Sequence, residues 1–259
     1  MNLPDDKLVF DVGHQSYTHK ILTGRKEEFY RLRQYGGISG FPKSCESESD
    51  AFNTGHSSTS ISAAMGLAEA RDLRGGNEKI CAVIGDGALT GGLAYEGLCD
   101  AGESGEPLVV ILNDNGMSID QNVGGIARLL SRSRMRPGYL RLKRGFRRTV
   151  GKMPLVYNFF HRIKEWVKNL ILHTGMFDDL GFNYMGPIDG HDLETLEEAL
   201  RWAKDFGAPV LLHVITQKGR GYPFAEQNPE IYHGVGAFDP AVGAEVCKDQ
   251  DYSAVFGEE

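Results

Sequence analysis

The arrangement of apolar residues along the chain constrains its fold more than any other feature. Four short runs rich in Val, Ile and Leu, each bounded by turn residues, have the character of buried β-strands. They cover residues 7–11, 80–84, 108–112 and 210–215. Stretches with helical length and apolar spacing lie between them, at residues 59–73, 93–103 and 193–206. This alternation predicts an α/β fold with a mostly parallel twisted sheet and helices on both faces.

One long segment interrupts the alternation. Residues from about 131 to 172 are rich in Arg, contain Pro137 and Pro154, and are expected to form a basic helical insertion. We therefore expect one domain over residues 1–245 that carries this insertion, followed by the start of a linker over residues 246–259.

A basic block overlaps this insertion. Residues 121–164 contain no Asp or Glu, although the whole chain has a net charge of −7. The block lacks regularly spaced aromatic residues and any nucleic-acid-binding motif. We therefore expect a solvated basic segment and no nucleic-acid partner.

Other features bear on where the protein works. No apolar run approaches the roughly 20 residues that span a bilayer, so we expect no membrane association. The N-terminal sequence MNLPDDKLVF lacks the basic and apolar regions of a secretory signal. The four cysteines are scattered without a C-x-x-C pair, which is typical of reduced thiols. These features predict a cytoplasmic protein.

The second and third predicted strands both end in polar residues. Gly85-Asp86-Gly87 follows the second strand, and Asn113-Asp114-Asn115 follows the third, one loop–helix–strand unit later. Ligands of open parallel sheets bind beyond the carboxyl ends of the strands, where Asp86 and Asn115 would lie side by side. Their hard oxygen donors suit Mg²⁺ that also coordinates phosphate. The glycines, and a helix that begins near Gly91, would let backbone N–H groups approach that phosphate.

Either polar cluster alone is common where a strand ends, but together they match the diphosphate–magnesium motif of thiamine-diphosphate enzymes. Asn113-Asp114-Asn115 is a slight variation on the paired asparagines of that motif. Further motifs, in order, are FDVGHQSYTHKILTGR (10–25), GGISGFPK (36–43), FNTGHSSTSISAAMGLA (52–68), MGPIDGHD (185–192), TQKGRGYPFAE (216–226) and YHGVGAFDP (232–240). Over nearly its whole length the chain resembles the 1-deoxy-D-xylulose-5-phosphate synthase family, which implies a thiamine-diphosphate-binding fold.

The resemblance implies a role for each residue that matches a family motif. Mg²⁺ would be bound by the side chains of Asp86 and Asn115 and by the backbone carbonyl of Met117. His14 and His56 would take part in catalysis. The residues expected to contact thiamine diphosphate are His14, Gly55, His56, Ser57, Gly87, Ala88, Asn115, Lys218 and Tyr222.

The implied reaction is the thiamine-diphosphate-dependent decarboxylative condensation of pyruvate with glyceraldehyde 3-phosphate, which gives 1-deoxy-D-xylulose 5-phosphate. It is the first step of the non-mevalonate isoprenoid pathway and supplies precursors of thiamine and pyridoxal. The family has a segment before DKLVFDVGHQ and continues past this chain's YSAVFG into a pyrimidine-binding domain, whose glutamate activates the cofactor. We expect this chain to work as a homodimer or with a complementing chain that carries the missing domains, and to be inactive without them.

Two other functions fit the same residues. The chain could be half of another transketolase-like enzyme, although TGHSS, GPIDGHD and the basic insertion fit the synthase better. It could also be a non-catalytic module that binds thiamine diphosphate and Mg²⁺.

Overall fold

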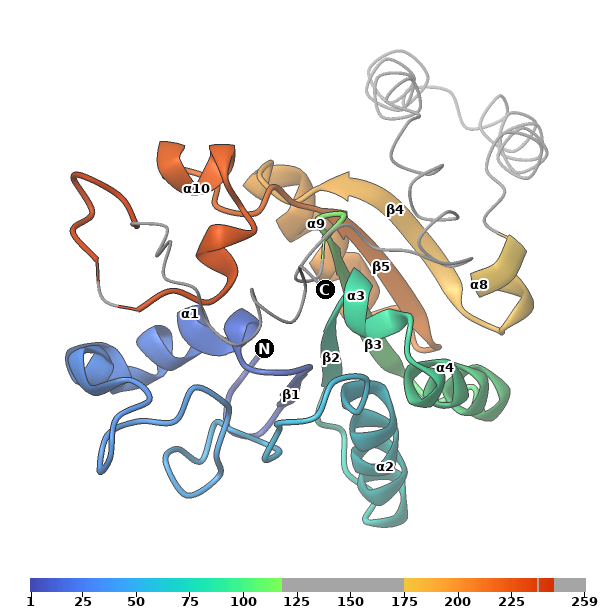
Figure 1. Cartoon of the computed structure of the whole chain (residues 1–259). Helices are drawn as coiled ribbons and strands as arrows, with labels where there is room; N and C mark the ends of the chain where they lie inside the picture. The colour runs from blue at the N-terminus through green and yellow to red at the C-terminus, as the bar shows by residue number, and fades with distance from the viewer. Residues whose placement is uncertain (118–174, 237, 245–259) are drawn as a thin grey trace, which may run out of the picture. The chain divides into compact units, whose positions relative to one another are not determined.

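The computed structural model describes residues 1–117, 175–236 and 238–244, which belong to two compact units with bounds 1–216 and 217–259. A five-stranded parallel sheet forms the centre of the first unit (Figure 1). Its strands are β1 (Lys7–Phe10), β2 (Ile80–Gly85), β3 (Leu108–Asp114), β4 (Asn183–Asp189) and β5 (Val210–Ile215). They lie in the order β1-β2-β3-β5-β4.

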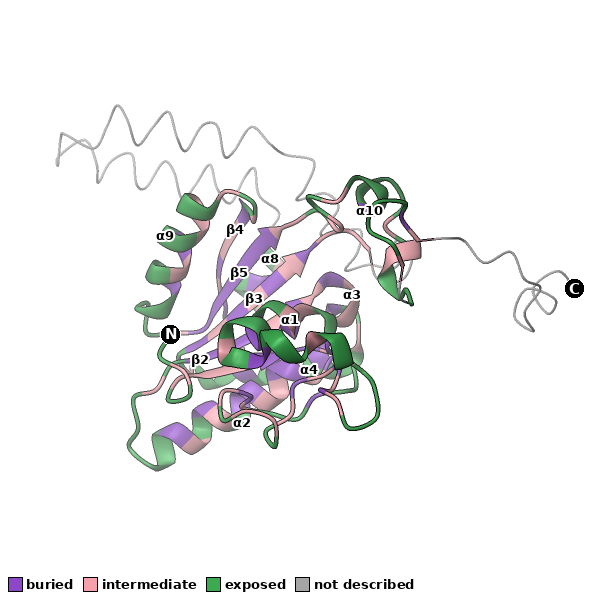
Figure 2. Cartoon of the chain, turned by 90° about the vertical axis from the view of Figure 1, so that its left-hand side faces the viewer, coloured by how far each residue is buried: buried purple, intermediate pink, exposed green. Residues whose placement is uncertain are grey.

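Helices cover both faces of this sheet. The described helices of the first unit are η1 (His14–Ser16), α1 (Tyr17–Lys20), η2 (Ile21–Arg25), η3 (Lys26–Arg31), α2 (Ser60–Leu73), α3 (Asp86–Leu89), α4 (Gly92–Ser104), α8 (Gly175–Asp179) and α9 (Leu193–Lys204). α2 and α4 pack on one face within the main hydrophobic core, whereas α9 packs on the other face against β4 and β5. Figure 2 shows the buried strands lying between α9 and α2. The predicted α/β fold with a parallel sheet is confirmed.

The order of the strands explains why the helices lie on opposite faces. The chain crosses the sheet in one direction from β1 to β2 to β3, and in the opposite direction from β4 to β5. Right-handed crossovers then place α2 and α4 on one face and α9 on the other. The side chains of β3 follow this division, because Val110 and Leu112 lie in the core beneath α2 and α4 while Ile111 packs in the cluster beneath α9.

The sequence predicts no strand at β4, and the structure explains the miss. Pro187 lies inside β4, and proline is rare within a central strand because it has no N–H to donate. β4 lies at the edge of the sheet, however, and its register with β5 shifts between Met185 and Ile188. Proline is tolerated at such an edge irregularity. The other four strands and the three predicted helices begin and end within two residues of their predicted bounds.

Two sequence predictions fall where the structure makes no statement. The insertion over residues 131–172 and the linker over residues 246–259 lie outside the described residues. Within the described ranges, no helix combines the length and the apolar character needed to cross a membrane.

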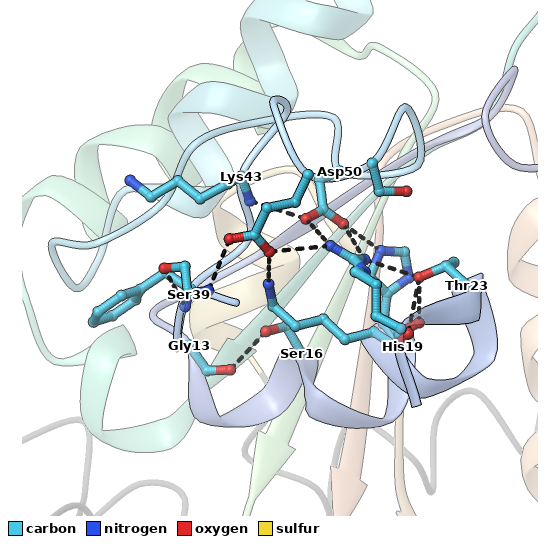
Figure 3. Close-up of polar contacts among 12 residues, drawn as sticks. Gly13, Ser16, His19, Thr23, Ser39, Lys43 and Asp50 are labelled. Atoms are coloured by element: carbon cyan, nitrogen blue, oxygen red, sulfur yellow. Dashed lines mark hydrogen bonds and ion pairs between the residues drawn. The ribbon is translucent and has the colours of Figure 1, made fainter. Parts of the chain in front are cut away.

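A buried ion cluster, formed by His19, Lys20, Arg25 and Asp50 with the half-buried Glu46, fixes the segment between β1 and α2 (Figure 3). Arg25 donates to both carboxylate oxygens of Asp50, at 2.7 and 2.8 Å. His19 Nε2 lies 2.9 Å from Asp50 Oδ1, and Lys20 Nζ donates to Glu46 Oε2 at 2.6 Å. The charged side chains of this cluster therefore pair chiefly with one another.

The cluster also holds the loop that contains Glu46 and Asp50. Backbone N–H groups of Ser39 and Lys43 donate to Glu46 Oε1 and Asp50 Oδ2, at 2.7 and 2.9 Å. Burial opposes ionisation of Asp50, but the hydrogen bonds from Arg25, His19 and Lys43 outweigh it and hold the pKa of this carboxyl well below its usual range. Asp50 is therefore a structural anion at neutral pH.

Candidate functional site

The segments that follow β1, β2 and β3 leave the sheet on one side, at the carboxyl ends of the strands; we call this side the carboxyl edge. These three strands are adjacent and parallel, with Phe10 paired to Val83 and Gly85 paired to Asn113. Their carboxyl ends therefore lie together, at the place where open parallel sheets bind ligands. All the predicted site residues from His14 to Met117 follow one of these strands or lie on the turn before α2.

Asp11, directly after β1, anchors the turn before α2. Its buried carboxylate accepts from the backbone N–H of Ser58 at 2.8 Å and from that of Ser60 at 3.0 Å. Thr54 Oγ1 donates to the carbonyl of Val12 at 3.0 Å. Ser58 has a left-handed backbone (φ +71°), a strained conformation that these contacts hold in place. The two ends of the TGHSS turn are thus fastened to the end of β1.

Asp86, at the end of β2, joins two turns. The side chain is 2% exposed, and its Oδ1 accepts from the N–H of Gly87 at 3.0 Å. Its Oδ2 accepts from the N–H of Gly116, beyond the end of β3, at 2.7 Å. Ser58 Oγ donates to the carbonyl of Ala88 at 2.7 Å, which links this turn to the one before α2. The predicted neighbourhood of Asp86 and the Asn115 segment is therefore present.

The turn after β3 places Asn115. Gly116 has φ +82°, a conformation that glycine adopts without steric cost. The backbone N–H of Met117 donates to Asn115 Oδ1 at 3.0 Å, so the amide oxygen is held over its own turn.

Asn113 connects this edge to the residues around His14. Its Nδ2 donates to Gln15 Oε1 at 3.1 Å, and its Oδ1 accepts from Thr216 Oγ1 at 2.6 Å. Gln15 also lies close to Gly85, because a Cβ added there would be 3.1 Å from Gln15 Nε2. One amide side chain thus ties the segment that carries His14 to β3 and to the end of β5.

The predicted contact residues lie at the accessible tips of these turns. His14, Gly55, His56 and Ser57 are exposed, and Gly87, Ala88, Asn115 and Met117 are half-buried. His56 Nδ1 lies 2.7 Å from the carbonyl of Ser57. Because a carbonyl can only accept, the Nδ1 carries a proton, and in the neutral ring Nε2 is the acceptor.

The residues at this edge fit a magnesium ion bound to a diphosphate. Across the described ranges, no three His, Cys, Asp or Glu side chains gather into a metal cage. One carboxylate (Asp86), one amide oxygen (Asn115) and one backbone carbonyl leave coordination positions for phosphate oxygens and water, which is how Mg²⁺ is usually held. α4 begins after Gly91 without a side-chain cap, so its first N–H groups can bind an anion.

Lys218 and Tyr222 belong to the second unit, which contains α10 (Pro223–Gln227) and η4 (Ile231–His233). Lys218 Nζ lies 2.8 Å from His233 Nδ1, and Tyr222 donates to the carbonyl of Pro240 at 2.9 Å. Desolvation, together with a hydrogen bond to Tyr232, raises the pKa of the Tyr222 phenol. The cofactor contact expected of these two residues stays a prediction.

Sequence reasoning missed the residues that hold the turns, above all Asp11, Ser58 and Asn113, and it also missed the buried His213. Asp11 could have been found as a carboxylate directly after a buried strand. His213 could have been found as a polar residue inside the apolar run VLLHVI, since a buried imidazole needs hydrogen-bond partners. Ser58 carries no such local signal.

Comparison with known proteins assigns the chain to a family. A family model described as 1-deoxy-D-xylulose-5-phosphate synthase matches residues 1–216. The chain belongs to this family. The 1-deoxy-D-xylulose-5-phosphate synthase of Clostridium kluyveri is 51% identical over 263 residues, and that of Syntrophomonas wolfei is 52% identical over 260 residues. The alignments cover 100% and 98% of this chain but 42% and 41% of those synthases.

Solved structures support the fold of this synthase-family chain. Transketolase from Campylobacter jejuni matches with a TM-score of 0.58 and 23% identity, over 87% of this chain and 31% of the transketolase. Transketolase from Leishmania mexicana matches with a TM-score of 0.55 and 22% identity, over 82% of this chain and 28% of that chain. At this identity the likeness concerns the fold alone.

Proposed function

We propose that this chain binds thiamine diphosphate through Mg²⁺ at the carboxyl edge of β1, β2 and β3, and that it supplies this part of the active site of a 1-deoxy-D-xylulose-5-phosphate synthase. The observation that carries the proposal is the bond from the Gly116 N–H to Asp86 Oδ2 at 2.7 Å. It holds the carboxylate at the end of β2 against the turn that contains Asn115. Membership of the synthase family supports the same assignment.

Each residue has a separate task in this proposal. Asp86, Asn115 and the carbonyl of Met117 would bind Mg²⁺, which anchors the diphosphate as a template. The N–H groups of Gly87 and Ala88 would bind the diphosphate oxygens. The exposed tips of the other turns would contact the rest of the cofactor.

The other residues proposed to contact the cofactor are the following. His14, Gly55, His56 and Ser57 lie on turns fixed by Asp11 and Asn113, directly or through Gln15. For Lys218 and Tyr222 the proposal rests on the family motif alone.

The proposed reaction joins pyruvate to glyceraldehyde 3-phosphate, with loss of CO₂, to give 1-deoxy-D-xylulose 5-phosphate. Thiamine diphosphate supplies the electron sink that decarboxylation requires. The chain's own part is to orient the cofactor and to hold protons near it, for which the exposed imidazoles of His14 and His56 are suited.

The complete activity needs more than this chain in our proposal. The chain spans about 42% of the length of the synthase from Clostridium kluyveri. We propose that full activity also uses the parts of the synthase that lie outside this alignment. Assembly as a homodimer or with a complementing chain stays a prediction from the sequence. Cytoplasmic location stays a prediction from the sequence.

Calorimetric titration with thiamine diphosphate, with and without Mg²⁺, tests the proposal. We expect binding that requires Mg²⁺ and that disappears in Asp86→Ala. Glu197→Gln, which changes an exposed carboxylate on α9, is the matched control and should bind as the wild type does. A folded wild-type chain that binds no thiamine diphosphate, or an Asp86→Ala variant that binds normally, would contradict the proposal.

A further inference from the structure

Three buried side chains form a hydrogen-bonded row across β3, β5 and β4. His213 is fully buried, with Nε2 2.8 Å from Asp114 Oδ2 and Nδ1 2.8 Å from the Tyr184 hydroxyl. Asp114 pairs with Ile215, and Tyr184 pairs with Leu211, so all three lie on one face of the sheet. This row lies on the face covered by α2 and α4.

The chemistry of the three groups fixes the direction of the row. An ionised carboxylate can only accept, so His213 Nε2–H donates to Asp114. In the neutral imidazole Nδ1 is then the acceptor, and the Tyr184 hydroxyl donates to it. The Tyr184 ring stacks on the Phe177 ring, with 5.8 Å between the ring centroids. Gly186 passes close to His213, because a Cβ added to Gly186 would lie 2.6 Å from the carbonyl oxygen of His213. Packing therefore holds the rings in place.

The row ends at the turn that carries Asn115. Asp114 Oδ1 accepts from the N–H of Gly116 at 3.2 Å, and the same N–H donates to Asp86 Oδ2 at 2.7 Å. Two carboxylates thus share one donor. His213 holds the other oxygen of Asp114, so the imidazole and the Gly116 N–H bind opposite oxygens of the same carboxylate.

We propose that His213 and Tyr184 are positioning residues for the magnesium-binding turn, acting through Asp114 and Gly116. The inference rests on the proposed function, because it assigns the Asn115 turn to Mg²⁺. His213 is fully buried and Tyr184 is 7% exposed, so we assign them a positioning role and no contact with a ligand. Residues that orient metal ligands typically contribute roughly 10–100-fold to metal affinity.

Variants of His213 separate positioning from general stability. His213→Leu removes the donor and leaves Asp114 buried without it, whereas His213→Gln keeps an N–H donor. Leu211→Ala is the matched control, because Leu211 is fully buried on the same face of β5 and its side chain makes no polar contact with the turn. Tyr184→Phe removes only the hydroxyl, and it serves if His213→Leu does not fold.

The first readout is the exchange rate of the Gly116 amide, measured by nuclear magnetic resonance on the chain without cofactor. We expect faster exchange in His213→Leu than in Leu211→Ala at matched global stability. His213→Gln should restore most of the protection, and Tyr184→Phe should have a smaller effect in the same direction as His213→Leu.

The second readout is the Mg²⁺ concentration that half-saturates thiamine diphosphate binding. We expect it to rise roughly 10–100-fold in His213→Leu and to stay near the wild-type value in Leu211→Ala. Equal Gly116 exchange and equal Mg²⁺ dependence in these two variants would overturn the inference. If the wild type does not bind thiamine diphosphate, the proposed function is contradicted instead. The Gly116 exchange rates would still decide whether His213 positions the turn.

Discussion

The buried ion cluster around Asp50 and the polar groups at the carboxyl edge of the sheet use charge in different ways. In the cluster, long side chains such as Arg25 and Lys20 pair with carboxylates (Figure 3). At the strand ends, the buried carboxylates of Asp11 and Asp86 accept from backbone N–H groups of neighbouring turns. Both arrangements fix loops, because the N–H groups of Ser39 and Lys43 also donate to the cluster. The carboxylates of the cluster are in addition paired with oppositely charged side chains.

This difference separates a structural cluster from a binding site. Buried ionisable groups occur in both regions, so burial alone does not identify a site. The strand-end carboxylates hold turns whose tips remain accessible, including His56 and Ser57. The location at the carboxyl ends of parallel strands and the partners of each carboxylate identify the candidate site.

The largest effect on stability should come from breaking the Asp50 cluster. We expect Arg25→Met to lower the free energy of unfolding by about 3–5 kcal/mol, because Asp50 then keeps a buried charge without its main partner. Urea unfolding measures the change. Cofactor affinity of the folded protein should be retained. A loss below about 1 kcal/mol, the value typical of exposed pairs, would show that the cluster is not a structural brace.

A smaller effect on stability, joined to a loss of binding, is expected at the strand ends. Asp11→Ala removes the acceptor for the N–H groups of Ser58 and Ser60. We expect it to lower the free energy of unfolding by about 2 kcal/mol. The TGHSS turn would also lose its anchor, so affinity for thiamine diphosphate should decrease. Urea unfolding measures the change in stability, and calorimetric titration of the same sample measures the affinity for thiamine diphosphate. Unchanged binding would break the distinction between the two regions.

The dependence of stability on pH should be concentrated in the Asp50 cluster. The pKa of Asp50 is lower in the folded protein than in the unfolded chain, so its ionisation stabilises the fold above the unfolded value of about 3.9. Unfolding of the wild type and of Asp50→Asn between pH 7 and pH 3 measures this contribution. We expect the difference in unfolding free energy between them to stay constant at neutral pH and to narrow as the pH falls below about 4. If the difference in unfolding free energy between wild type and Asp50→Asn did not change with pH, the predicted contribution of Asp50 ionisation to stability would be wrong.

The smallest effect should come from an exposed ion pair that belongs to neither region. Arg201 Nη2 donates to Glu197 Oε1 at 2.6 Å on the surface of α9. Glu197→Gln should change the unfolding free energy by less than about 0.5 kcal/mol, because solvent screens exposed pairs. A larger loss in urea unfolding would show that pairing itself, rather than burial, sets the stability of the Asp50 cluster.

Much of this molecule could be predicted from local sequence. Four strands and three helices follow from apolar spacing, and Asp86 and Asn115 follow from their places after neighbouring strands. β4 was not predicted, because an internal proline argues against a strand. Only the structure shows that this strand lies at the edge of the sheet, where proline is tolerated. Contacts such as Asp11 with Ser58, 47 residues apart, depend on how the chain folds back on itself, and no local pattern reports them.

A crystal structure of the chain with thiamine diphosphate and Mn²⁺, used in place of Mg²⁺ for its anomalous signal, tests the central claim most directly. We expect a single strong anomalous peak between the Asp86 carboxylate and the Asn115 side chain, with the diphosphate beside Gly87. Cofactor bound elsewhere, or bound at this edge without a metal peak beside Asp86, would contradict the account.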